Sequence, residues 1–116
     1  MAHYEEFEIA QGADISIELE LQNADGSRKN LTSHTITAHM RRNYTSEDYT
    51  AFTPLIANPP QNGICSLNLT NEQTADLIKG NYVYDVELSY LDSDENTIVE
   101  RILEGRITVT PNVTRT

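Results

Sequence analysis

The chain has 116 residues, 38% of them hydrophobic, and a formal net charge of −10 at pH 7. This length predicts one domain with a single modest core. Lysine and arginine are adjacent only in the pairs Arg28-Lys29 and Arg41-Arg42. Because nucleic acid and anionic membrane surfaces are bound through larger basic patches, we expect neither as a partner.

Cys65 is the single cysteine, which excludes an intrachain disulfide and a cysteine-based metal site. Its neighbours Ile64 and Leu67 predict a buried thiol rather than a nucleophile. The first residues have neither the basic start nor the apolar run of a secretory signal, and no apolar stretch approaches a membrane span. We therefore expect folding in a reducing cytoplasm.

Alternating apolar and polar residues predict the strands of the first third of the chain. We expect an edge strand over residues 4–10 and, after a break, a half-buried strand over residues 15–21. Asp and Gly in residues 23–27 predict a turn, because both tolerate the left-handed conformations of tight turns. A third strand is predicted over residues 35–42, with alternate apolar residues facing inward.

A proline interrupts the segment that follows. Polar residues 43–48 predict a loop, and residues 49–57 contain Pro54, which cannot donate a hydrogen bond to a strand ladder. We therefore expect residues 49–57 to form an edge strand or a broken strand. A turn over residues 58–63 and a strand over residues 64–69 complete this part.

One short helix is predicted between the strands. Thr70 with Gln73 three residues later matches a capping box, in which the two side chains and backbone amides bond reciprocally. Residues 74–79 then carry apolar side chains at helical spacing, and Gly80 is suited to end the helix.

The strongest strand pattern covers residues 80–90. Five residues at period two are expected to face the core, and acidic residues take most of the other face. This pattern fixes the register of the strand, because a shift of one residue in its pairing would bury the acidic side chains. The inward residues are Tyr82, Tyr84, Val86, Leu88 and Tyr90.

A turn over residues 92–96 leads into a last long strand over residues 97–110. We expect one face of this strand to be buried, with Gly105 as a bulge or a point of close backbone approach. The residues expected on the buried face are Val99, Leu103, Ile107 and Val109.

About seven short strands with turns between them and one short helix predict an all-β fold, a β-sandwich occupying residues 1–116 as one domain. A small open barrel is the alternative. The chain shows no internal repeat and no linker.

Patterns that would support catalysis or metal binding are weak. His34 and His39 are five residues apart, so on one strand they would face opposite sides and could not bind one metal together. The acidic pairs Glu18/Glu20 and Asp85/Glu87 lie on faces expected to be solvated, and no Ser/His/Asp set or phosphate-binding glycine loop is present. We therefore expect no enzyme activity and no cofactor.

Residues 92–96 place Asp92, Asp94 and Asn96 at the spacing of the first half of an EF-hand calcium loop. The positions that should hold glycine and glutamate hold Thr97 and Leu103 instead. A hairpin turn explains the three residues equally well, because Asp and Asn are turn formers. Calcium binding stays open as the less favoured interpretation.

The predicted loop 43–48 and its flanks are the best candidate for a partner contact. Tyr44 and Tyr49 lie in or beside it, with Arg41 and Arg42 just before. Tyrosine and arginine are the residue types that anchor protein interfaces. An ordinary solvated loop is the alternative for these four residues.

Six segments, which together span nearly the whole chain, carry a pattern that occurs in known proteins. They are Gln11-Gly12-Ala13-Asp14, Asp25-Gly26-Ser27, Asn30-Leu31-Thr32, Leu69-Thr70-Asn71-Glu72-Gln73-Thr74, Tyr82-Val83-Tyr84-Asp85-Val86-Glu87 and residues 98–111. The tyrosine-rich strand and the Arg-Ile-Leu-Glu-Gly run are the more specific. Together the segments resemble a family of small virion structural proteins of tailed bacteriophages, especially common among myoviruses of marine cyanobacteria. A similar pattern occurs in the immunoglobulin-like N-terminal domain of phage baseplate proteins that attach receptor-binding modules to the tail.

This resemblance implies an immunoglobulin-like β-sandwich that docks on a virion, without catalysis or a cofactor. Because no receptor-binding segment follows Thr116, we expect a decorating, cementing or adaptor role on capsid, tail or baseplate subunits rather than an adhesin. The expected location is the virion, assembled in the host cytoplasm, with other virion proteins and possibly further copies of this chain as partners. A carbohydrate- or calcium-binding module in host attachment is the alternative.

Overall fold

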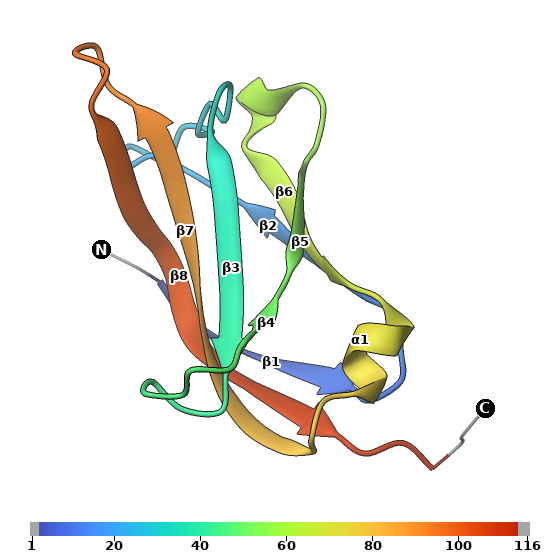
Figure 1. The fold of residues 1–116 in the computed structure, drawn as a ribbon. Coiled ribbons are helices and arrows are strands. Elements are labelled where there is room, and N and C mark those ends of the chain that lie inside the picture. The colour runs from blue at the N-terminus through green and yellow to red at the C-terminus, as the bar shows by residue number, and fades with distance from the viewer. Residues whose placement is uncertain (1–2, 114–116) are drawn as a thin grey trace.

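The computed structural model describes residues 3–113 and shows two β-sheets packed face to face (Figure 1). One sheet has five strands in the order β1-β8-β7-β3-β4, and the other has three in the order β2-β6-β5. The strands are β1 (His3–Ala10), β2 (Ile15–Glu20), β3 (Thr35–Arg41), β4 (Thr50–Ala51), β5 (Thr53–Ile56), β6 (Ile64–Leu69), β7 (Gly80–Leu91) and β8 (Thr97–Thr110).

The order of the strands is that of an immunoglobulin-like sandwich. In that fold, the third, sixth and seventh strands of the constant-type domain form one sheet against a second sheet containing the other strands, and an extra edge strand can extend the first. Here β3, β7, β8 and the extra strand β4 form the first group, β1 adds to it at the other edge, and β2, β6 and β5 form the second. The predicted all-β, immunoglobulin-like sandwich with about seven strands and one short helix is therefore confirmed.

The segment around Pro54 is broken, as the sequence predicts. β4 pairs with β3 in the five-stranded sheet, whereas β5 pairs with β6 in the three-stranded sheet. Phe52 lies between them, is buried, and donates its backbone N–H to the carbonyl of Ala38 at 3.0 Å. The chain thus crosses from one sheet to the other around a buried phenylalanine.

The core lies between the two sheets. The alternation in β7 places Tyr82, Tyr84, Val86 and Leu88 among the buried residues, as predicted. Alternate residues of β6 are buried as well, and they include Cys65. Burying a large apolar side chain stabilises the folded state by roughly 1.5–3 kcal/mol. The buried side chains of β6 and β7 therefore hold the two sheets together.

The helix is present but shorter than expected. α1 (Asn71–Ala75) has the predicted capping box, because Gln73 N donates to Thr70 Oγ1 at 3.2 Å and Thr70 N donates to Gln73 Oε1 at 2.9 Å. The expected extension to residue 79 is wrong, and Gly80 begins β7 instead of ending the helix. No helix in the described part of the chain has the length and apolarity needed to cross a bilayer.

A tyrosine explains why the helix ends early. The Tyr82 hydroxyl donates to the carbonyl of Ile78 at 2.8 Å and accepts from its N–H at 2.9 Å. This is the tyrosine corner of immunoglobulin-like domains, where a tyrosine early in the sixth strand bonds to backbone a few residues upstream. These bonds and the buried side chain of Leu77 turn the chain into β7.

The last strand contains a bulge that changes which of its residues face inward. The register of β8 against β7 shifts between Val86 and Glu87, so that Val86 lies opposite Leu103 but Glu87 lies opposite Arg101. Leu103 and later odd-numbered residues are buried, whereas Val99 is 57% exposed. The prediction that Val99 shares the buried face is wrong, because the extra residue reverses the alternation.

Gly105 is the predicted point of close approach rather than the bulge. It lies between Tyr84 of β7 and Glu5 of β1 in the sheet. A Cβ at this position would lie 1.9 Å from the carbonyl oxygen of Glu5. The Tyr84 hydroxyl donates to that same oxygen at 2.8 Å. The missing side chain therefore lets β1 pack closely against β8 as a parallel strand.

Candidate interaction surface

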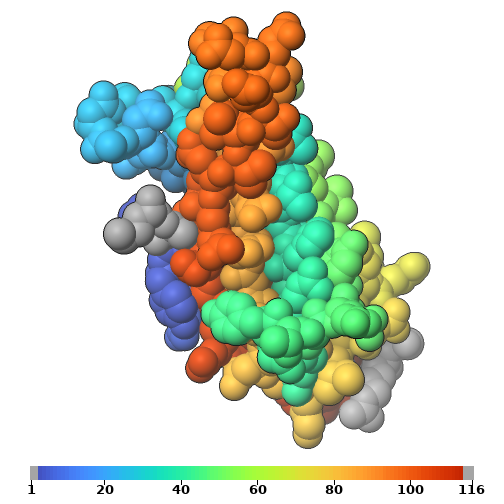
Figure 2. Space-filling model, turned by 60° about the vertical axis from the view of Figure 1, so that its left-hand side comes forward, coloured from blue at the N-terminus to red at the C-terminus, as the bar shows by residue number. Residues whose placement is uncertain are grey.

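The outer face of the five-stranded sheet carries a shallow recess of about 380 Å³. Figure 2 looks onto this face, where β8, β7 and β3 run side by side and the green loop after β3 crosses their lower end. Side chains from all three strands and from that loop line the hollow. The sheet recess consists of His39, Arg41, Tyr44, Val83, Tyr84, Asp85, Glu87, Arg101 and Glu104.

Arg41 organises the loop that borders the recess. Its Nη1 donates to the carbonyls of Ser46 at 2.8 Å and Glu47 at 3.0 Å. Its guanidinium carbon also lies 4.8 Å from the centre of the Tyr49 ring, and that ring stacks on His39 with centroids 4.1 Å apart. Such contacts contribute about 0.5–1 kcal/mol at exposed sites, so they hold the loop in one conformation beside the sheet.

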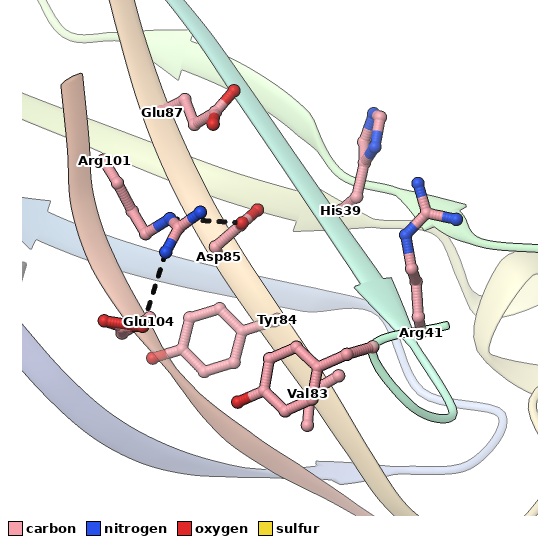
Figure 3. Close-up of a pocket in the computed structure, with 9 residues that line it drawn as sticks. His39, Arg41, Val83, Tyr84, Asp85, Glu87, Arg101 and Glu104 are labelled. Carbon is pink, nitrogen blue, oxygen red and sulfur yellow. Dashed lines mark ion pairs between the residues drawn. The ribbon is translucent and has the colours of Figure 1, made fainter. Parts of the chain in front are cut away.

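Arg101 connects the acidic side of the recess. Its Nε lies 3.5 Å from Asp85 Oδ2, and its Nη1 lies 3.8 Å from Glu104 Oε1 (Figure 3). All three side chains are partly exposed, and surface ion pairs contribute little stability. The pairs therefore add little to stability and place one cation between two carboxylates on this face of the sheet.

Three of the four residues predicted for a partner contact come together. Arg41 and Tyr44 line the recess, and Tyr49 packs beside it on His39 and Arg41. Both tyrosines are well exposed, Tyr44 at 82% and Tyr49 at 53%. Aromatic and arginine side chains beside a rigid sheet are suited to anchor a partner.

Arg42 lies apart from this group. Its guanidinium carbon is 4.9 Å from the centre of the Tyr82 ring, and its Nη1 donates to the carbonyl of Lys79 at 3.3 Å. Alternation explains the difference, because residue 42 follows β3 with the same parity as buried Met40. Arg42 therefore covers the tyrosine corner.

Besides Val83 and Tyr84 of β7, sequence reasoning missed five residues of the recess that carry a charge or an imidazole. Asp85 and Glu87 were correctly expected on a solvated face, but nothing local linked them to the loop. His39 follows from the alternation of β3 and could have been found that way. Arg101 and Glu104 could not, because they flank the bulge and so cannot be placed by simple alternation. The missed residues are His39, Asp85, Glu87, Arg101 and Glu104.

The other candidates for chemistry have structural roles. Asp92 Oδ1 accepts from the N–H groups of Asp94 and Asn96, both at 2.9 Å, which closes the β7–β8 hairpin. The His34 ring lies against the Tyr90 ring at a tilt of 30°, whereas His39 stacks on Tyr49, so the two histidines do not share a site. Within residues 3–113, no three His, Cys, Asp or Glu side chains gather as metal ligands would.

Cys65 is buried, as the sequence predicts. Burial raises the pKa of its thiol to about 11. Because the thiolate is the reactive form, this side chain is inert at neutral pH.

No protein-family model matches the sequence, and no curated protein is similar to it at a significant level. Among solved structures, the chain is similar to AggA, the major subunit of aggregative adherence fimbriae type I from Escherichia coli, with 11% identity, 89% coverage of both chains and a TM-score of 0.48. It is also similar to part of a family 123 glycoside hydrolase from Clostridium perfringens, with 14% identity and a TM-score of 0.38. That match covers 95% of this chain and 23% of the hydrolase. Neither likeness bears on function.

Proposed function

We propose that this chain is a non-enzymatic docking domain of a tailed-phage virion, which attaches to other capsid, tail or baseplate subunits as a decorating, cementing or adaptor protein. The phage assignment is supported by the sequence resemblance. The docking role is carried by one structural observation, the sheet recess with two exposed tyrosines beside it.

The physical character of this surface supports docking over catalysis. Interfaces are rich in tyrosine and arginine and rest on rigid elements, whereas an acid–base site needs a carboxylate held in an enclosed pocket. Here Tyr44 and Tyr49 lie in a loop beside strands β3, β7 and β8 of the five-stranded sheet. The carboxylates Asp85 and Glu104 are partly solvated and paired with Arg101. A net charge of −10 also steers the chain toward basic partner surfaces.

Quantitative mass spectrometry of purified phage particles tests the location. Intact particles are compared with separated heads and tails, using an isotope-labelled standard of the protein. We expect a fixed copy number per particle in one fraction, because a docking domain binds a defined number of sites. High copy number in heads indicates decoration or cement, and few to tens of copies in tails indicate an adaptor. Recovery only as free protein in the lysate would overturn the proposal.

A pair of variants tests the surface. Tyr44→Ala removes the most exposed tyrosine of the recess, and we expect at least a tenfold loss of incorporation into particles, because truncating an interface anchor costs about 2 kcal/mol or more. The matched control is Leu55→Ala, which removes a side chain 60% exposed on β5 of the other sheet. Equal incorporation of both variants would assign the docking surface elsewhere.

The alternative function is carbohydrate binding in host attachment, and the recess itself favours it. Small-ligand sites combine apolar or aromatic walls with a few placed polar groups, and the recess contains Tyr44, His39, Asp85 and Glu87. A glycan array probed with the isolated protein tests this idea. Binding that Tyr44→Ala removes and Leu55→Ala preserves would support it, and an array without signal counts against it.

A further inference from the structure

The upper half of β8, residues 97–102, has one edge that no strand of the described residues 3–113 pairs with. β1 pairs with β8 only from Leu103 to Thr110, although β8 begins at Thr97. None of the described residues pairs with the outer edge over residues 97–102, whereas β7 pairs with the inner edge from Thr97 to Arg101. Unpaired N–H and C=O groups on such an edge can accept a further strand.

A groove runs beside this edge. It has a volume of about 780 Å³ and lies between β8 and the segment that follows β2. In Figure 2 that segment is the blue projection to the left of upper β8. Leu21 and Ile102, both packed against the core, line the groove. A strand added to β8 would thus find an apolar contact as well as backbone partners.

The charged side chains around the groove indicate which kind of segment it could bind. Lys29 Nζ lies 3.9 Å from Glu100 Oε2, and Arg101 is paired with Asp85 and Glu104 on the outer face of the sheet. Both groove cations therefore already have acidic partners within the protein. Glu20 also lines the groove and forms no ion pair within the described part of the chain. The uncompensated charge at this place is negative.

We propose that the groove accepts an extended segment of a partner subunit, which adds to β8 at residues 97–102 and carries lysine or arginine toward Glu20. Six residues of strand span roughly 20 Å, so the segment is short. Its backbone pairs with β8, small β-branched side chains reach Leu21 and Ile102, and a basic side chain meets Glu20. The inference rests on the proposed function only in taking the partner to be another virion subunit.

Hydrogen exchange of the purified full chain, followed by NMR, tests the groove without the virion. The probe is the end-blocked peptide Lys-Val-Lys-Thr-Lys-Val-Lys-Thr. We expect slowed exchange, at least tenfold, at alternate amides within residues 97–102, because one edge of an added strand satisfies alternate residues. The control peptide has proline in place of both valines, keeps the charge, and should give no protection because proline cannot donate to the ladder.

Two variants test the charge. Glu20→Lys should weaken binding of the lysine peptide at least tenfold. Glu18→Lys makes the same charge change two residues away on the same strand, outside the groove, and should leave binding within about twofold. The inference is overturned by protection at β2 or β5 instead, by equal binding of the proline peptide, by equal effects of both variants, or by no protection with millimolar peptide. None of these results alters the virion test, so failure of the two proposals is distinguishable.

Discussion

The two halves of β8 differ although they belong to one strand. From Leu103 to Val109 the strand is paired on both edges, and Leu103, Ile107 and Val109 are buried. From Thr97 to Arg101 it is paired with β7 only, among the residues that the structure describes, and Val99 is exposed. The bulge opposite Val86 and Glu87 separates the halves. One element thus contributes core stability at one end and an accessible edge at the other.

The largest expected difference between the halves is in stability. Ile107→Ala should lower the free energy of unfolding by about 2–5 kcal/mol, because it leaves a cavity in the core. Val99→Ala should change it by less than about 0.5 kcal/mol, since the side chain is mostly in water. Urea denaturation of the two variants measures both values. Equal losses would mean that the upper half is covered in solution and that the comparison fails.

Adding one carbon atom at Gly105 should disturb the pairing of β1 with residues 103–110 of β8. Gly105→Ala places a Cβ against the Glu5 carbonyl and should cost about 1–3 kcal/mol through overpacking. We also expect faster hydrogen exchange at the amides of β1. The control, Gly26→Ala, has no atom within 4 Å of the added Cβ but a φ of +87°, so it costs about 1–2 kcal/mol of backbone strain. Slow exchange of β1 in both variants would contradict the role of Gly105.

The Tyr84 hydroxyl offers a smaller, pH-dependent test. Tyr84→Phe removes the hydrogen bond to Glu5 and should cost about 1 kcal/mol at neutral pH. Burial, and secondarily the negative charge of Glu5, raise the pKa of Tyr84 above 10 in the folded protein. The folded state therefore keeps a proton that the unfolded state releases, so this contribution is present below pH 10 and is lost as the pH rises further.

Melting temperatures between pH 8 and pH 11 measure the effect of Tyr84. We expect the wild type to lose more stability above pH 10 than Tyr84→Phe does. The variant should still lose some stability at high pH, because two other groups also have raised pKa values in the folded protein. A hydrogen bond to Glu100 raises the pKa of Tyr90, and burial raises the pKa of Cys65. Parallel curves for the two proteins would show that Tyr84 titrates alike in the folded and unfolded states.

Sequence reasoning succeeded where the signal is local. The capping box at Thr70 and Gln73 depends on residues three positions apart, and both of its bonds form. The break near Pro54 follows from a missing donor. Where Arg42 lies depended on distant packing, and the structure places that side chain over Tyr82, apart from the sheet recess. Whether Arg41, Arg42, Tyr44 and Tyr49 bind a partner stays a prediction.

Alternation and charge can be read residue by residue, so the amino-acid sequence was enough to predict most strands, the inward faces of the regular ones and the acidic surface. Three features emerge only in the folded protein: β1 runs parallel to β8, Ile102 adds a residue opposite β7, and Arg101 pairs with Asp85 beside the loop. These features depend on which strands become neighbours and in what register. Strand neighbours and register are determined by contacts between residues far apart in the chain. The alternation of apolar and polar residues within one strand contains no information about those contacts.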